Sequence, residues 1–487
     1  MESLAAIINC LSVGEVKLVR HFYKLKNYGE YRKRVLLFDI VTKQKNYTNK
    51  EAAKILGYSK SNTSSFKHLK ARLKSDVLCT LLMQDCSSKF ATPYAQAIFD
   101  CRRNLMQGEM LMNRGIHEEA HEILWKASKV AAKFELFAEG LQIEDARRNY
   151  IAQKGNIMDF EVVSDAMEEN FVKLGREMIA KRNHYKITIP QLLGVKTLEE
   201  YNRKGRFLIH DISNISKSKD SSRTKFYQHL AGINYYSSIR DFTSAQNHAL
   251  ELLKNIENNP VINSKSNQAG VNMELANIYL NNGNYENAIS HSIKAVELFK
   301  PGMINQLHAC VILFFSFFRN NDFKNASKIL AVANEHKMIK YQKYPLMVSR
   351  LQLLHAAVSF KEGDYDKSSF ILRENFDLSR DKDGWMPGYF LLESLTLLEK
   401  NAVDLAAYRI EAFRKMLERI NFRDEYRIRS IMRILKKLAR DGGNYNKFVP
   451  TKNKDIKMLS EAKEHYYWNP TGYEIIRFDE WLLQKVS

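Results

Sequence analysis

A segment near the middle of the chain, "ANIYLNNGNYENAISHSIKAVELF" (residues 276–299), most constrains the fold. It places Gly283, Tyr285, Ala288 and Ala295 at the spacing G-x-Y-x-x-A-x-x-x-x-x-x-A. Glycine suits the end of a helix where the chain turns back, because it adopts a left-handed backbone without strain. Small alanines let two helices approach closely. The segment therefore predicts a pair of packed helices, with the tyrosine filling the wedge between them.

Weaker copies of this pattern recur along the chain. Their wedge positions 242, 285, 323, 365 and 403 are separated by 43, 38, 42 and 38 residues. Repetition of this kind predicts that successive helix pairs stack on one another. The copies place, in chain order, Gly115, His117, Ala120, Leu124 and Ala127; Gly155 and Ile157; Phe242, Ala245, Ala249 and Leu252; Phe323, Ala326, Leu330 and Ala333; Gly363, Tyr365, Ser368 and Leu372; and Val403, Ala406 and Phe413.

The spacing resembles that of the tetratricopeptide-repeat (TPR) family. The resemblance implies an all-α superhelical solenoid of antiparallel helix pairs, whose concave groove binds a peptide or a protein. The usual TPR period is 34 residues, so we expect TPR-like units with longer helices or turns. Only 8 prolines and 20 glycines interrupt the 487 residues, which agrees with a mostly helical protein.

The motif His117-Glu118-x-x-His121 lies inside one copy and also matches a zinc-hydrolase signature. A catalytic zinc needs a third protein ligand and an open coordination position. The continuation H-x-x-G-x-x-H is absent, and the sequence favours neither Glu139 nor Glu144 as a downstream ligand. Because the repeat explains the same residues as packing positions, we expect no metal and no cofactor. A zinc-dependent hydrolase is the alternative.

Positive charge is concentrated at the start of the chain. The net charge is +20, and residues 1–90 contain seventeen Lys and Arg against seven Asp and Glu. Clustered positive charge favours a polyanion such as nucleic acid, or an acidic protein face. A solvated basic surface without a ligand is the alternative.

Within this basic region, residues 46–78 resemble a helix-turn-helix. Thr48 and Glu51 have capping-box spacing before a short helix. A turn at residues 57–59 follows, and then a second helix with Phe66 on its inner side. Thr63 departs from the motif, which usually has a buried aliphatic residue there. A three-helix domain with a purely structural role is the alternative.

The resemblance implies that the outward side chains of the second helix face a DNA groove. Lys70 and Lys74 would then lie near phosphates, where lysine adds affinity without sequence information. The residues expected to face the nucleic acid are Lys60, Ser61, Asn62, Ser64, Ser65, Lys67 and His68.

The remaining sequence suggests further boundaries. Pro190 and the polar run 213–223 interrupt the helical pattern and suggest a hinge or an insertion. Residues 422–440 predict an amphipathic helix with a basic stripe. Phe478, Trp481 and Leu482 are expected to cover the last apolar face.

We expect a basic domain at 1–90, helix pairs at 91–212, a linker at 213–223, helix pairs at 224–442, and a loop with capping helices at 443–487.

The five cysteines are odd in number and scattered, which argues against a disulfide framework and for a reducing compartment. The chain start lacks the features of a secretory signal, and the most apolar run, 309–318, is about half the length needed to cross a bilayer. We therefore expect a cytoplasmic protein without membrane contact. Phosphate-binding loops and nucleophile elbows are absent from the sequence.

The predicted function is that of a non-enzymatic adaptor or regulator. Its solenoid surface would bind a protein or peptide partner, and its basic N-terminal domain would contact nucleic acid. A purely structural subunit of a larger assembly is a further alternative.

Overall fold

The computed structural model describes residues 2–26, 28–43, 48–61, 63–82, 92–193, 198–215, 221–341, 345–374, 384–419, 426–445 and 454–486. All regular secondary structure in these ranges is helical, which confirms the predicted all-α class. The chain packs into two compact units, Met1–Asp100 and Cys101–Ser487. None of the described helices is both long and apolar enough to cross a bilayer.

The first unit has a core built by five helices. Tyr23, Phe38 and Phe66 are among its fully buried side chains. The buried phenol of Tyr23 donates a hydrogen bond to Asp76 at 3.0 Å, and Arg34 pairs with the same carboxylate at 2.8 Å. The helices are α1 (Glu2–Asn9), α2 (Val13–Leu25), α3 (Tyr28–Lys43), α4 (Asn49–Ile55) and α5 (Ser64–Leu82), followed by α6 (Pro93–Met112), which contains the unit boundary.

The second unit contains the other helices. They are α7 (His117–Lys133), α8 (Phe137–Gln153), α9 (Ile157–Leu193), α10 (Leu198–Ile215), α11 (Ser222–Ser238), α12 (Phe242–Asn258), α13 (Lys265–Asn281), α14 (Tyr285–Leu298), α15 (Ile304–Arg319), α16 (Phe323–Asn334), α17 (Lys337–Lys340), α18 (Pro345–Lys361), α19 (Tyr365–Arg373), α20 (Met386–Glu399), α21 (Val403–Arg419), α22 (Tyr426–Arg440), α23 (Lys454–Glu461), the 3-10 turn η2 (Glu464–Tyr466) and α24 (Phe478–Val486).

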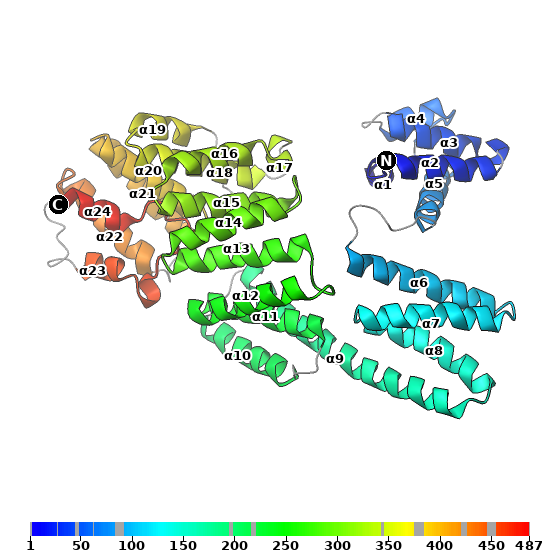
Figure 1. Cartoon of the computed structure of the whole chain (residues 1–487). Helices are drawn as coiled ribbons and strands as arrows, with labels where there is room; N and C mark the ends of the chain where they lie inside the picture. The colour runs from blue at the N-terminus through cyan, green and yellow to red at the C-terminus, as the bar shows by residue number, and fades with distance from the viewer. Residues whose placement is uncertain are drawn as a thin grey trace. The chain divides into compact units, whose positions relative to one another are not determined.

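Helices adjacent in the sequence pack in pairs, and each pair packs on the next. Figure 1 shows α11 to α16 and α18 side by side. The small residues of the repeat pattern lie in the contacts, since Ala245, Ala288, Ala326 and Ala406 are fully buried. A continuous apolar core extends from α13 to α24. The wedge residues are the first residues of α12, α14, α16, α19 and α21.

The turns inside four pairs, α11–α12, α13–α14, α15–α16 and α18–α19, have the same construction. One residue has a left-handed backbone: Arg240 (φ 65), Gly283 (φ 72), Asn321 (φ 58) or Gly363 (φ 81). The next residue, an Asp or Asn, caps the following helix by accepting a hydrogen bond from a backbone N–H two residues beyond the wedge position. We call this two-residue unit the corner. Glycine occupies only some corners, because asparagine and, at one position, arginine adopt the same backbone.

Two successive pairs also share a polar contact at equivalent positions. Nδ1 of His229 lies 3.2 Å from Nδ1 of His248, which stacks on Tyr236. Forty-three residues later, Asn272 lies 2.8 Å from Nδ1 of His291. His291 stacks in turn on Tyr279, which is 43 residues after Tyr236. The internal repetition therefore extends from spacing to side-chain contacts.

Two expected interruptions are placed differently. Pro190 lies inside α9, within its last turn, so the helix ends soon after the proline rather than before it. The expected linker 213–223 is divided, since Ser213 belongs to α10 and Ser221 caps α11. Residues 216–220 lie outside the described part of the chain.

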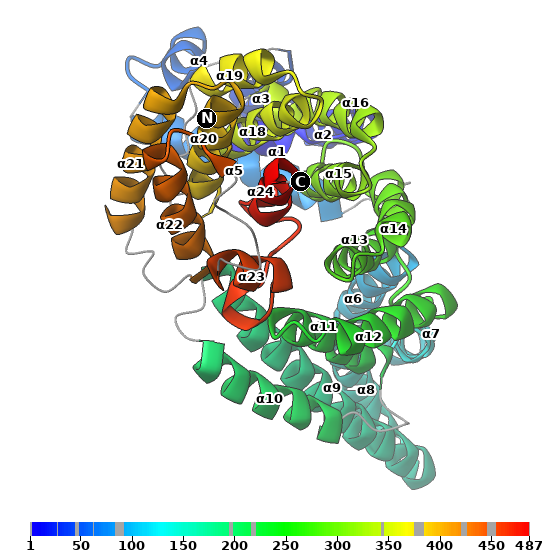
Figure 2. The same cartoon turned by 90° about the vertical axis from the view of Figure 1, so that its left-hand side faces the viewer.

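The end of the chain lies against the helix pairs. Figure 2 shows α11 to α22 arranged in an arc around α24. Phe478, Trp481 and Leu482 of α24 are buried in the main core. Trp481 donates a hydrogen bond to Glu399 of α20 at 2.6 Å. These side chains thus pack against the interior of the arc.

Acid should destabilise the histidine contact in the first of the two equivalent pairs. Burial lowers the pKa of His229 to about 4, with His248 and Lys225 acting in the same direction and Glu251 opposing them. The folded pKa is below the unfolded value near 6.5. Stability is therefore present above pH 6.5 and lost as pH falls towards 4.

We expect His229→Asn, which copies the Asn272 contact, to reduce the stability lost between pH 7 and pH 4 by on the order of 2 kcal/mol. Urea unfolding at both pH values measures the difference. The exposed His117→Asn serves as control. An unchanged loss in His229→Asn contradicts the assignment of this acid sensitivity to His229.

Candidate functional site

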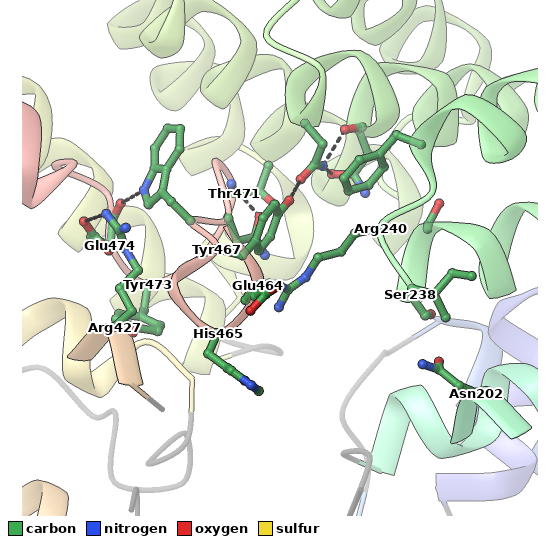
Figure 3. A pocket seen from close by; sticks show the side chains of 18 residues that line it. Asn202, Ser238, Arg240, Arg427, Glu464, His465, Tyr467, Thr471, Tyr473 and Glu474 are labelled. Atoms are coloured by element: carbon green, nitrogen blue, oxygen red, sulfur yellow. Dashed lines mark hydrogen bonds and ion pairs between the residues drawn. The ribbon is translucent and has the colours of Figure 1, made fainter. Parts of the chain in front are cut away.

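A cavity of about 890 Å³ in the second unit is the candidate binding site. Its walls come from α10, the α11–α12 corner, α13, α22 and residues 464–474 (Figure 3). We call residues 462–477 the C-terminal segment. We call the side of the helix pairs that contacts it the inner face. The cavity lies between the inner face and the C-terminal segment.

One wall of the cavity is closed by Tyr467. The guanidinium of Arg240 lies 4.0 Å from the centre of the Tyr467 ring and donates a hydrogen bond to the carbonyl oxygen of Glu464 at 2.5 Å. The phenol of Tyr467 donates a hydrogen bond to the side-chain oxygen of Asn281 on α13. Burial raises the pKa of Tyr467 to about 12, so the phenol remains a donor at neutral pH. Phe242 also stacks near this ring.

Arg319, at the end of α15, holds the next part of the C-terminal segment. Its guanidinium donates hydrogen bonds to the carbonyl oxygens of Pro470, at 2.9 and 2.7 Å, and Ile475, at 2.6 Å. Burial lowers the pKa of Arg319 to about 10, so it is still charged at neutral pH. A side chain at Gly388 of α20 would collide with the carbonyl oxygen of Tyr473. The main chain therefore lies directly on the inner face.

Arg427 of α22 anchors both ends of the C-terminal segment. Its guanidinium pairs with Glu474 at 2.6 and 2.8 Å and with Asp479 at 2.7 Å, and all three side chains are buried. It also donates hydrogen bonds to the carbonyl oxygens of Leu459 and Tyr466. Burial alone would lower the pKa of Arg427, but the hydrogen bonds and charges of the two carboxylates raise it.

A second cavity of about 240 Å³ continues along the inner face. It shares Asn277 and Thr471 with the larger cavity and is also lined by Glu274, His308 and Arg350. Burial raises the pKa of Glu274. Burial and the charge of Arg350 lower the pKa of His308. The inner face thus presents amide, carboxyl, imidazole and guanidinium groups.

In the first unit, the predicted nucleic-acid residues separate into two groups. Lys60 and Ser61 precede α5, which begins only at Ser64, and Asn62 lies outside the described residues. The placement of the first two on the second helix is therefore wrong. The reason is Thr63, whose hydroxyl accepts a hydrogen bond from the N–H of Phe66 at 3.4 Å and so marks the helix start.

The other predicted residues of this set lie on α5. Ser64, Ser65, Lys67, His68 and Lys74 are exposed, and Lys70 is half-buried. The amine of Lys70 donates a hydrogen bond to Asn49 at 3.0 Å, and that of Lys74 lies 3.4 Å from the hydroxyl of Ser3. The structure thus places most of the predicted set on the solvent side of one helix.

Four carboxylates of the first unit have partners of their own. Glu15 and Glu51 complete capping boxes at the starts of α2 and α4. Asp39 pairs with Arg20 at 2.8 Å, and Asp76 with Arg34. Hydrogen bonds from Thr48 lower the pKa of Glu51.

The zinc-like motif lies at the start of α7. His117 is exposed, and both His117 and His121 lie against the ring of Tyr150, at 6.4 and 4.7 Å between ring centres. Burial and the charge of Arg147 lower the pKa of His121. The two suggested downstream ligands are engaged elsewhere, Glu139 with Arg102 and Glu144 with Arg147. The described residues bring no third metal-ligating side chain to the histidines.

The sequence reasoning missed the arginines of the inner face. Arg427 is the second residue of α22 and lies on its buried side, where a charge usually signals a buried partner. Neither the known protein-family models nor the curated proteins give a match to this chain.

Removing the Arg427 side chain should test the anchor. Arg427→Leu leaves Glu474 buried without its cation and Asp479 with Arg477 alone, and we expect a loss of about 3–5 kcal/mol in the free energy of unfolding. The exposed Arg429→Leu on the same helix should change it by less than about 0.5 kcal/mol. Denaturant titration compares the two, and equal effects would contradict the anchoring role.

Proposed function

We propose that this protein is a non-enzymatic adaptor or regulator that binds a polypeptide partner on the inner face of a TPR-like superhelical array. The corners at 240, 283, 321 and 363 recur at intervals of 43, 38 and 42 residues, which supports the repeat. The observation that carries the proposal is the C-terminal segment itself. It is a stretch of mostly irregular main chain already seated on the inner face.

The seating uses chemistry that other polypeptides share. Arg240, Arg319 and Arg427 donate hydrogen bonds to main-chain carbonyl oxygens. Every peptide carries such acceptors, so the inner face suits an extended polypeptide. The cavity volume of about 890 Å³ falls within the range of ligand sites, about 300–1,000 Å³, and Asn202 and Asn277 add amide groups to its lining.

The proposed compartment is the cytoplasm, because the cysteines are scattered and the described ones, Cys10, Cys79, Cys101 and Cys310, are free. A purely structural subunit would use the outer surfaces of the helix pairs instead. A partner would therefore bind the inner face of an adaptor but the outer surface of a structural subunit.

Blocking the cavity distinguishes these functions. Asn277→Arg places a long charged side chain in both inner-face cavities, whereas Glu286→Arg changes an exposed position on α14. Some proteins should copurify with the wild-type chain from its native source. We expect their amount to fall at least about tenfold with Asn277→Arg, which corresponds to a loss of about 1.4 kcal/mol in binding free energy. They should be retained with Glu286→Arg. Retention by both variants favours the structural subunit.

We further propose that the first unit contacts nucleic acid through a helix-turn-helix-like pair, α4 and α5. Lys67, His68 and Lys74 are exposed on α5, and Asp39 and Asp76 of the same unit pair with Arg20 and Arg34. Gly57 supplies a left-handed turn after α4 (φ 75). The connection between the helices, residues 56–63, is longer than the usual three to four residues.

Salt dependence tests this second proposal. The full chain should bind duplex DNA more weakly as the salt concentration rises. Lys67→Glu and Lys74→Glu should each reduce, by about 1, the steepness with which the logarithm of the binding constant falls against the logarithm of the salt concentration. Lys24→Glu, an exposed change on α2, is the control for net charge. Fluorescence anisotropy measures the slopes. No binding at about 50 mM salt, or equal slopes in all three variants, contradicts the contact.

A further inference from the structure

The part of the C-terminal segment that closes the cavity, residues 464–469, meets the α11–α13 side through Tyr467 and the main chain of Glu464. We call these residues the tip. The contacts include the hydrogen bond from Arg240 to the carbonyl oxygen of Glu464, the hydrogen bond from Tyr467 to Asn281, and the ring contacts of Tyr467 with Arg240 and Phe242. Tyr467 is thus the principal side chain that bridges to these helices.

The backbone at the start of the tip is strained. Ala462 and Glu464 have left-handed backbones, with φ of 48° and 49°, although neither is glycine. Ala462 directly follows α23 and Glu464 is the first residue of η2, so both lie where the chain leaves the helix for the tip. Such strain persists only while surrounding contacts hold it, so release of Tyr467 would also relax the backbone.

The rest of the C-terminal segment is attached independently. Arg319 holds the carbonyl oxygens of Pro470 and Ile475, and Arg427 holds Glu474 and Asp479. Neither set of contacts includes Tyr467 or Asn281. Within the tip, Arg427 also holds the carbonyl oxygen of Tyr466, and Arg319 lies on the ring of Trp468. Displacement from the α11–α13 surface therefore concerns the Tyr467 side chain and the Glu464 carbonyl group, while α24 stays in the core.

We propose that Arg240, Phe242 and Asn281 form a docking site for an extended polypeptide bearing a tyrosine, and that the tip occupies this site until such a partner displaces it. This inference depends on the proposed polypeptide-binding function and names the residue chemistry that the inner face recognises.

The seated tip defines what the partner must supply. Its phenol donates to Asn281, its ring lies on the guanidinium of Arg240, and a carbonyl oxygen three residues earlier accepts from Arg240. One short extended peptide can supply all three groups. The adjoining cavity of about 890 Å³ provides room for the residues that flank the tyrosine.

A synthetic peptide copying residues 463–472, KEHYYWNPTG, serves as the probe. In the full chain, Tyr467→Ala vacates the site but keeps Arg240, Phe242 and Asn281. We expect the labelled peptide to bind this variant at least tenfold more tightly than the wild type, whose own tip competes. A peptide with the same Tyr467→Ala change should bind neither chain.

Two further variants guard against misfolding and nonspecific binding. Tyr467→Phe keeps the ring and loses only the hydrogen bond, so it should fold and bind the peptide with intermediate affinity. Adding Asn281→Ala to Tyr467→Ala should weaken peptide binding again. Equal peptide affinity for wild type, Tyr467→Phe and Tyr467→Ala would overturn the docking site, as would a peptide that ignores Asn281→Ala.

The outcomes also separate this inference from the broader function. If Asn277→Arg loses cellular partners but the peptide shows no preference for Tyr467→Ala, the tyrosine docking site is wrong and polypeptide binding stands. If the peptide prefers Tyr467→Ala but partners ignore Asn277→Arg, the site is correct and the adaptor function fails.

Discussion

The buried ion cluster of Arg427, Glu474 and Asp479 is the interaction on which the candidate site depends. It joins α22 to a segment 47 residues later and to α24 beyond it. A lone buried charge is costly, and here two carboxylates and two main-chain carbonyl oxygens compensate one guanidinium. Without this cluster the C-terminal segment would keep its contacts with Arg240 and Arg319 but lose its buried attachment to α22, and the wall of the cavity would weaken there.

Much of the architecture follows from local sequence. The scarcity of proline and the recurrence of small and aromatic residues predict helices in pairs, and the structure confirms an all-helical chain with adjacent helices packed together. The sequence carries one further signal of the corners. Asp241, Asn284, Asp322 and Asp364 each precede a wedge residue and cap its helix. An Asp or Asn directly before the aromatic residue would have located these corners even where glycine is absent.

The candidate site was less accessible to such reasoning, because its contacts join distant residues. Arg240 meets Glu464 across 224 positions, and Arg319 meets Pro470 across 151. No periodic pattern encodes pairings of this separation. In the first unit the error was smaller and local. The motif puts Thr63 at a core position, but its hydroxyl caps the start of α5. The helix therefore begins at Ser64, several residues later than expected.

Arg240 combines two roles that pull in opposite directions. As a corner residue it needs a left-handed backbone, which a side chain disfavours and glycine would adopt freely. Its long side chain nevertheless reaches Glu464 and Tyr467 on the far wall of the cavity. A glycine at position 240 would ease the turn and at the same moment release that wall. At position 240, an unstrained backbone and a closed cavity therefore require different residues.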